Sequence, residues 1–136
     1  MRGLMLLSVM LIAGLAWGGP QIKALSADEL ENFEGLLVDI RQPWEWQETG
    51  IVTGARTITF ESIDQFRRAI EPYLDDDTPV ALICRSGNRT RAASQALARH
   101  LDQPVVDVAG GMLRLMGEGY QASTFQPSEG DCPEYC

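Results

Sequence analysis

The chain has 136 residues and a formal net charge of −8. This length suffices for one domain with a buried core. Acidic residues outnumber basic ones, and Lys23 is the single lysine, so the chain lacks the positive charge that a nucleic-acid-binding surface requires. We therefore expect one folded domain and no nucleic-acid partner.

Residues 1–18 have the layout of a secretory signal peptide. Arg2 gives a positive start, residues 4–16 are almost all apolar, and the small residues Ala16 and Gly18 stand at the −3 and −1 positions of a cleavage site. The apolar run is shorter than the ~20 residues that span a bilayer. We favour a cleaved signal over an uncleaved membrane anchor or a buried helix, and we expect a periplasmic or secreted protein without stable membrane contact.

From residue 19 onward, short apolar runs alternate with helix-like segments. The pattern predicts strands at 22–25, 36–39, 55–59, 80–83 and 104–108. Between them it predicts a helix after Ser26, with Glu29 completing a capping box, and helices at 42–48, 62–73, 90–101 and 110–117. This alternation predicts an α/β fold with a small, mainly parallel sheet and helices on both faces.

The cysteines are Cys84, Cys132 and Cys136. Spare thiols pair in the oxidising compartment that an export signal implies. We therefore favour a disulfide between Cys132 and Cys136 in a polar tail at 122–136, with free thiols or a metal or redox pair as alternatives. Because His100 is the single histidine, we expect no metal and no cofactor. Cys84 is then the thiol that stays free.

Cys84 stands where a predicted strand ends and a helix begins. It opens the loop Cys84-Arg85-Ser86-Gly87-Asn88-Arg89-Thr90. The free N–H groups and the dipole of a helix N-terminus favour negative charge, and neighbouring cations favour the thiolate. Gly87 allows the backbone to turn several N–H groups inward. An inert core cysteine would not explain these neighbours, so the loop predicts a site for a reactive thiolate or a small oxyanion.

The motif Cys84-x-x-Gly87-x-Arg89-Thr90 resembles the active loop of single-domain rhodanese-like sulfurtransferases. Three further segments match that family in the correct order: residues 37–46, residues 50–55, and residues 106–119 with a double glycine. The resemblance covers residues 22–121 and implies a rhodanese-like domain at 19–121. Ile51 departs from the family's histidine, and Leu115 from the aromatic residue that follows its double glycine, so local geometry is expected to differ there.

The resemblance implies a thiosulfate sulfurtransferase. The Cys84 thiolate would take sulfur from thiosulfate or a similar small anionic donor, hold it as a persulfide, and pass it to cyanide or a thiol acceptor. Arg85 would attract the donor, and Arg89 would orient the loop. The implied donor-binding residues are Arg85, Ser86, Gly87, Asn88, Arg89 and Thr90.

Three charged residues upstream, Asp39, Arg41 and Glu45, are predicted to form a scaffold network around the loop. Direct contact between Arg41 and the substrate is the alternative.

Two other functions compete with sulfur transfer. Related loops that hydrolyse phosphate esters or reduce arsenate hold one more residue between cysteine and arginine, whereas four residues separate Cys84 from Arg89 here, which favours sulfur. The other alternative is an exported redox or sulfur-carrier module that binds a partner and uses Cys84 with Cys132 and Cys136. The sequence leaves the oligomeric state open.

Overall fold

The computed structural model describes residues 18–127 and contains one five-stranded parallel sheet. The strand order is β1-β5-β4-β2-β3. The strands are β1 (Gln21–Lys23), β2 (Leu36–Asp39), β3 (Arg56–Thr57), β4 (Val80–Ile83) and β5 (Val105–Val108). The helices are α1 (Ala27–Glu31), α2 (Pro43–Thr49), α3 (Ile63–Ile70), the 3₁₀ helix η1 (Glu71–Tyr73), α4 (Asn88–Ala98) and α5 (Gly111–Gly117).

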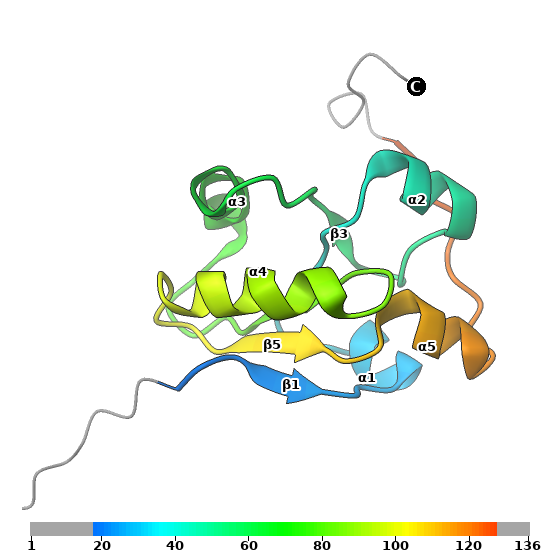
Figure 1. Ribbon diagram of the computed structural model, residues 1–136, viewed down its shortest axis with the longest axis horizontal. Coiled ribbons are helices and arrows are strands. Elements are labelled where there is room, and N and C mark those ends of the chain that lie inside the picture. The colour runs from blue at the N-terminus through cyan, green and yellow to red at the C-terminus, as the bar shows by residue number, and fades with distance from the viewer. Residues whose placement is uncertain (1–17, 128–136) are drawn as a thin grey trace, which may run out of the picture.

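Helices cover both faces of the sheet (Figure 1). One core lies on the side of α3 and α4 and includes Val38, Phe66 and Leu97. The other lies on the side of α1 and α5 and includes Leu30, Ile83 and Leu115. Both cores use residues of β2 and β4, because successive side chains of a strand point to opposite faces. The predicted α/β fold, with a parallel sheet between helices, is confirmed.

Local capping explains where two of the helices begin. The Ser26 hydroxyl accepts the Glu29 N–H at 3.2 Å, and a Glu29 carboxylate oxygen accepts the Ser26 N–H at 2.7 Å. This is the capping box that the sequence predicts before α1. Ser62 caps α3 by accepting the N–H of Gln65. The apolar strands are therefore separated by helices whose starting points depend on local side chains.

Several predicted boundaries are wrong by a few residues. α4 begins at Asn88 instead of Thr90, because Gly87 adopts a φ of +91° and turns the chain directly into the helix. α3 ends at Ile70 and continues as the 3₁₀ helix η1, where Pro72 has no N–H to donate to a longer α-helix. β3 is only two residues long.

The predicted polar tail begins too early. Ile51 and Ser123 exchange two backbone hydrogen bonds of 2.9 Å. Phe125 is 9% exposed, and its ring centroid lies 5.3 Å from that of Trp46. The packed domain therefore continues through Phe125, because Ala122 packs on the core, Ser123 pairs with Ile51, and the Phe125 ring packs on Trp46. Cys132, Cys136 and residues 1–17 lie outside the described residues.

No helix within residues 18–127 combines the length and the apolar character that crossing a bilayer requires.

Candidate active site

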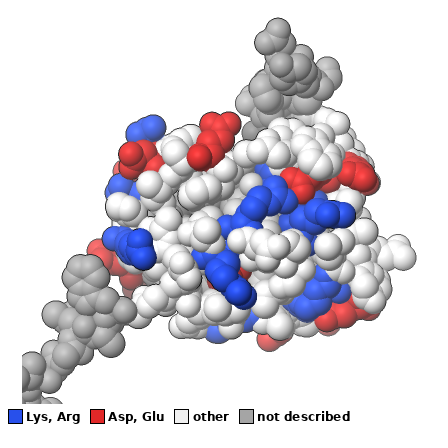
Figure 2. Space-filling view, in the orientation of Figure 1, with Lys and Arg blue, Asp and Glu red and all other residues white. Residues whose placement is uncertain are grey.

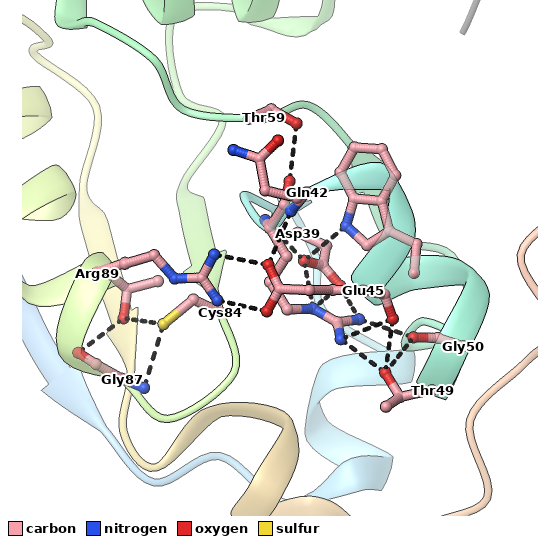
Figure 3. Close-up of polar contacts among 12 residues, drawn as sticks. Asp39, Gln42, Glu45, Thr49, Gly50, Thr59, Cys84, Gly87 and Arg89 are labelled. Carbon is pink, nitrogen blue, oxygen red and sulfur yellow. Dashed lines mark hydrogen bonds and ion pairs between the residues drawn. The ribbon is translucent and has the colours of Figure 1, made fainter. Parts of the chain in front are cut away.

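Cys84 directly follows β4, which lies between β5 and β2 in the sheet. Its side chain has no exposed surface. The sulfur accepts the Gly87 N–H at 3.2 Å and lies 3.6 Å from the Thr90 hydroxyl oxygen (Figure 3). Thr90 is also fully buried, and its hydroxyl donates to the Gly87 carbonyl oxygen at 3.2 Å. The loop therefore folds around the sulfur and directs the Gly87 N–H at it.

The double glycine at the start of α5, Gly110 and Gly111, packs against the backbone of this loop. A Cβ atom on Gly111 would lie 2.3 Å from the Cys84 carbonyl oxygen, so no larger residue fits there without a backbone shift. The close approach lets the Met112 and Leu113 N–H groups donate to the Cys84 and Arg85 carbonyl oxygens, both at 2.9 Å. The first turn of α5 thereby holds the first two residues of the loop in place.

Arg89 reaches away from the loop and joins α4 to α2. Its two terminal nitrogens donate to the two carboxylate oxygens of Glu45, both at 2.7 Å (Figure 3). The Arg89 side chain is 44% exposed and the Glu45 side chain 5%. This two-pronged contact fixes the direction of the guanidinium and ties the first turns of both helices together.

The charges of this pair are mutually stabilised. Burial alone would raise the pKa of Glu45, but hydrogen bonds from Arg89 and from the Gln42 N–H outweigh burial and hold that pKa below its ordinary value of 4.5. The hydrogen bond to Glu45 raises the pKa of Arg89 above its ordinary value. Both groups therefore stay ionised at neutral pH.

Asp39 and Arg41 form a buried ion pair behind the loop. Arg41 is 1% exposed, and its nitrogens lie 2.7–3.1 Å from the Asp39 carboxylate. The remaining guanidinium donors bind the Thr49 hydroxyl and the Gly50 carbonyl oxygen at 2.7 Å each. Arg41 has no donor left for a substrate, and its position is that of a scaffold residue.

Three further residues belong to this network and were not predicted from the sequence. The Trp46 indole N–H donates to Asp39 at 3.1 Å, and Thr49 and Gly50 accept from Arg41. Trp46 adjoins Glu45 in a matched motif, which could have suggested its role. Thr49 and Gly50 have no such signal, since Gly50 contributes only a carbonyl oxygen at the end of α2.

The outer wall of the loop is open to solvent. Arg85, Ser86 and Asn88 are exposed, and Gly87 is half-buried. His100 is exposed at the far end of α4, so it does not meet Cys84. Between residues 18 and 127 no group of three or more histidine, cysteine or acidic side chains is placed to hold a metal ion. Of the predicted site residues, the structure brings Cys84, Gly87 and Thr90 together and directs Arg89 to Glu45.

The model of the rhodanese-like domain family matches residues 22–117. This chain belongs to the rhodanese-like family. The match spans every element from β1 to α5, and it confirms the family that the Cys84 motif and the three other segments indicate.

Known relatives of this rhodanese-like domain agree with that assignment. The thiosulfate sulfurtransferase GlpE of Pseudomonas putida is 34% identical over 99 residues, which cover 72% of this chain and 84% of the relative. A rhodanese-related protein of Thermoplasma volcanium is 30% identical with a TM-score of 0.52, covering 72% of this chain and 94% of its own. A rhodanese-like domain protein of Staphylococcus aureus is 22% identical with a TM-score of 0.56. The match covers 76% of this chain and 98% of the other protein, and it supports the fold.

Proposed function

We propose that this rhodanese-like domain is a sulfurtransferase that carries sulfur on Cys84. The observation that supports this most is the Cys84 sulfur, which ends a central strand and receives the Gly87 N–H inside a tight loop. The sequence similarity to a thiosulfate sulfurtransferase also supports sulfur transfer as the reaction. Thiosulfate or a similar anion is the proposed donor, and cyanide or a thiol is the proposed acceptor.

In the first half-reaction, the Cys84 thiolate attacks the outer sulfur of thiosulfate. The sulfur–sulfur bond of thiosulfate breaks, and sulfite leaves with the bonding electron pair. Cys84 then holds a persulfide, whose terminal sulfur is stabilised by backbone N–H groups of the loop, in the way that backbone N–H groups stabilise other anions. Exposed Arg85 attracts the doubly charged donor. Because Cys84 is fully buried, the loop must move and expose the sulfur before the donor can reach it.

In the second half-reaction, the acceptor attacks the terminal sulfur of the persulfide. Cyanide leaves as thiocyanate, or a thiolate leaves as a persulfide, and the Cys84 thiolate is restored with the electron pair of the broken bond. The Glu45–Arg89 pair keeps the first turn of α4 in position through both steps. Two separate half-reactions predict double-displacement kinetics.

A mass measurement tests the first half-reaction. Incubation of the protein with thiosulfate should add the mass of one sulfur atom (~32 Da) to the chain, as covalent catalysis through a persulfide requires. Cyanide should remove the added mass, and Cys84→Ala should prevent it. Cys84→Ala that still gains and releases the sulfur would show that another group carries it, and an unmodified wild-type chain would refute the proposal.

We also propose that the protein acts outside the cytoplasm, in the periplasm or after secretion. The support is the sequence of residues 1–18, with its positive start, apolar run and small residues before a cleavage site. Delivery to that compartment would place Cys84 among oxidants, where a fully buried thiol has an advantage over an exposed one.

A further inference from the structure

Two cavities of the described structure lie away from the loop. One cavity of about 360 Å³ is lined by residues of β3, η1 and the segment 124–126, and another of about 230 Å³ is lined by the N-terminal segment and the end of α4. Neither is lined by a residue of the loop 84–90. An acceptor much larger than cyanide would also meet the exposed surface beside the loop, which includes Arg85, Ser86 and Asn88.

Exposed apolar side chains lie on α2 and α5, the two helices that contact the loop through Glu45 and through the Met112 and Leu113 N–H groups. Trp44 of α2 is 62% exposed, and it directly precedes Glu45, which binds Arg89. On α5, Leu113 and Met116 are 48% and 42% exposed. These two side chains share one stripe of the helix, and the Leu113 N–H binds the Arg85 carbonyl oxygen. Three of the five large hydrophobic side chains that are exposed among residues 18–127 thus belong to the two helices that contact the loop.

Uncompensated positive charge lies in the same region. Arg85 and Arg91 are exposed, and neither forms an ion pair with the residues that the structure describes. In Figure 2 basic side chains occupy the middle of the face that carries α4, and most acidic ones lie toward its outline. In a chain of net charge −8, this local excess attracts a negatively charged partner and repels a basic one.

We propose that Trp44, Leu113 and Met116, together with Arg85 and Arg91, form a docking surface for a protein acceptor. The partner that fits presents an exposed cysteine thiol within an acidic surface that also has apolar side chains. Its thiolate attacks the terminal sulfur of the Cys84 persulfide, the sulfur–sulfur bond breaks, and the partner leaves as a persulfide while Cys84 keeps the electron pair. This inference rests on the proposed sulfurtransferase function and names the acceptor class.

The surface is suited to brief contact. A few apolar side chains and two arginines form an interface smaller than those of stable complexes, and weak transfer complexes have interfaces of that kind. Short-lived binding lets each partner leave after one sulfur atom has moved. The arginines raise the rate of encounter, and the apolar side chains slow dissociation.

The test loads Cys84 with sulfur from thiosulfate and then mixes the persulfide form with a single acceptor. The probes are a synthetic acidic peptide, Glu-Asp-Leu-Cys-Leu-Asp-Glu, its basic counterpart Lys-Lys-Leu-Cys-Leu-Lys-Lys, and cyanide. Loss of the added mass from the chain gives the rate of transfer. The acidic peptide should react faster than the basic one, and the difference should shrink as salt is added.

Variants separate docking from chemistry. Trp44→Ser and Leu113→Ser should each slow transfer to the acidic peptide by about tenfold, the effect of losing an apolar anchor, and should leave transfer to cyanide unchanged. Ile22→Ser, at a 56% exposed side chain on the opposite edge strand β1, is the matched control and should change neither rate. Arg91→Gln should slow the acidic peptide, whereas Arg99→Gln at the other end of α4 should not.

Equal rates for both peptides, or unchanged peptide transfer in Trp44→Ser and Leu113→Ser, would overturn the docking surface while leaving the sulfurtransferase intact. Equal slowing of cyanide transfer in these variants would also overturn it, because the side chains would then act on the loop itself. Failure of the wild-type chain to form the persulfide would instead refute the sulfurtransferase, and it would be seen before any acceptor is added.

Discussion

Arg41 is a buried cation whose hydrogen-bonding capacity is filled. Nε and Nη2 contact Asp39, Nη2 also donates to the Gly50 carbonyl oxygen, and Nη1 donates to the Thr49 hydroxyl and the Glu45 carbonyl oxygen. Burial of a charge is costly unless the charge is paired and hydrogen-bonded. The geometry meets both conditions, so Arg41 holds the end of β2 against α2 and stays away from solvent.

Arg41→Met should therefore destabilise the fold. Removal of one partner of a buried pair costs about 3–5 kcal/mol, which lowers the Tm of a domain of this size by about 10 °C or more. Thermal unfolding measures the effect, and Arg99→Met at an exposed site is the control. An unchanged Tm with a raised KM for thiosulfate would show that Arg41 acts on the substrate.

The residue type allowed at position 111 depends on the backbone of Cys84. The Cys84 carbonyl oxygen occupies the space that any side chain at position 111 would need. A reactive cysteine is recognisable from its own neighbours, but the need for glycine at position 111 arises from a residue far away in the sequence. The position of the Cys84 carbonyl group thus depends on a backbone contact with the second residue of the double glycine.

At the scale of elements, the contact between α2 and α4 is the main support of the loop. Glu45 and Arg89 lie in the first turns of the two helices and are 44 positions apart in the chain. The ion pair links the segment after β2 to the segment after β4, and both strands end at the same edge of the sheet. The sheet order therefore decides that the two charges meet.

Stability should depend on the ionisation of Glu45 at acidic pH. The folded-state pKa lies below the ordinary value of 4.5, so the stabilisation is complete above that value and is lost as the pH falls through the lower folded-state pKa. Wild type should be more stable than Glu45→Gln at pH 7, and the difference in Tm should narrow only below about pH 4.5.

Thermal unfolding from pH 7 to pH 3 measures this difference. Glu34→Gln, at an exposed position, is the control and should change the Tm little at either end of the range. A gap between wild type and Glu45→Gln that stays constant down to pH 3 would show that the carboxylate charge does not contribute.

For the whole molecule, the distribution of charge affects the attraction of anionic partners to the loop more than the net charge does. The net charge of −8 disfavours anionic partners, yet arginines gather around α4 (Figure 2). Electrostatic attraction acts over about a Debye length, ~8 Å at physiological salt. A small anion or an acidic partner near the loop therefore meets mainly the local positive charge. The overall acidity supports the expectation that nucleic acid is not a partner.

Export also concerns the whole molecule and has a direct test. Expression of the full chain in a bacterium that has a periplasm, followed by fractionation and N-terminal sequencing, should give a mature protein in the periplasm or medium that begins at Gly19. A chain that keeps Met1 and stays in the cytoplasm would refute export. A chain that keeps Met1 and sediments with membranes would indicate an anchor.

Much of the fold was predictable because its signals are local. Apolar strands such as Val80–Ile83 and the capping box of Ser26 and Glu29 depend on neighbours within a few residues. The boundaries were less accurate, since Gly87 lengthened α4 at its start and the burial of Phe125 extended the domain. These differences depend on packing against other segments.

The sequence by itself determined the fold class and the family and indicated Cys84 as the candidate thiol, because periodic apolar residues and loop composition act over short distances along the chain. Only the tertiary structure decided that Arg89 binds Glu45, that the Cys84 carbonyl oxygen lies against Gly111, and that α2 and α5 both contact the loop. These contacts join segments far apart in the chain, and the order of strands in the sheet sets which of them meet.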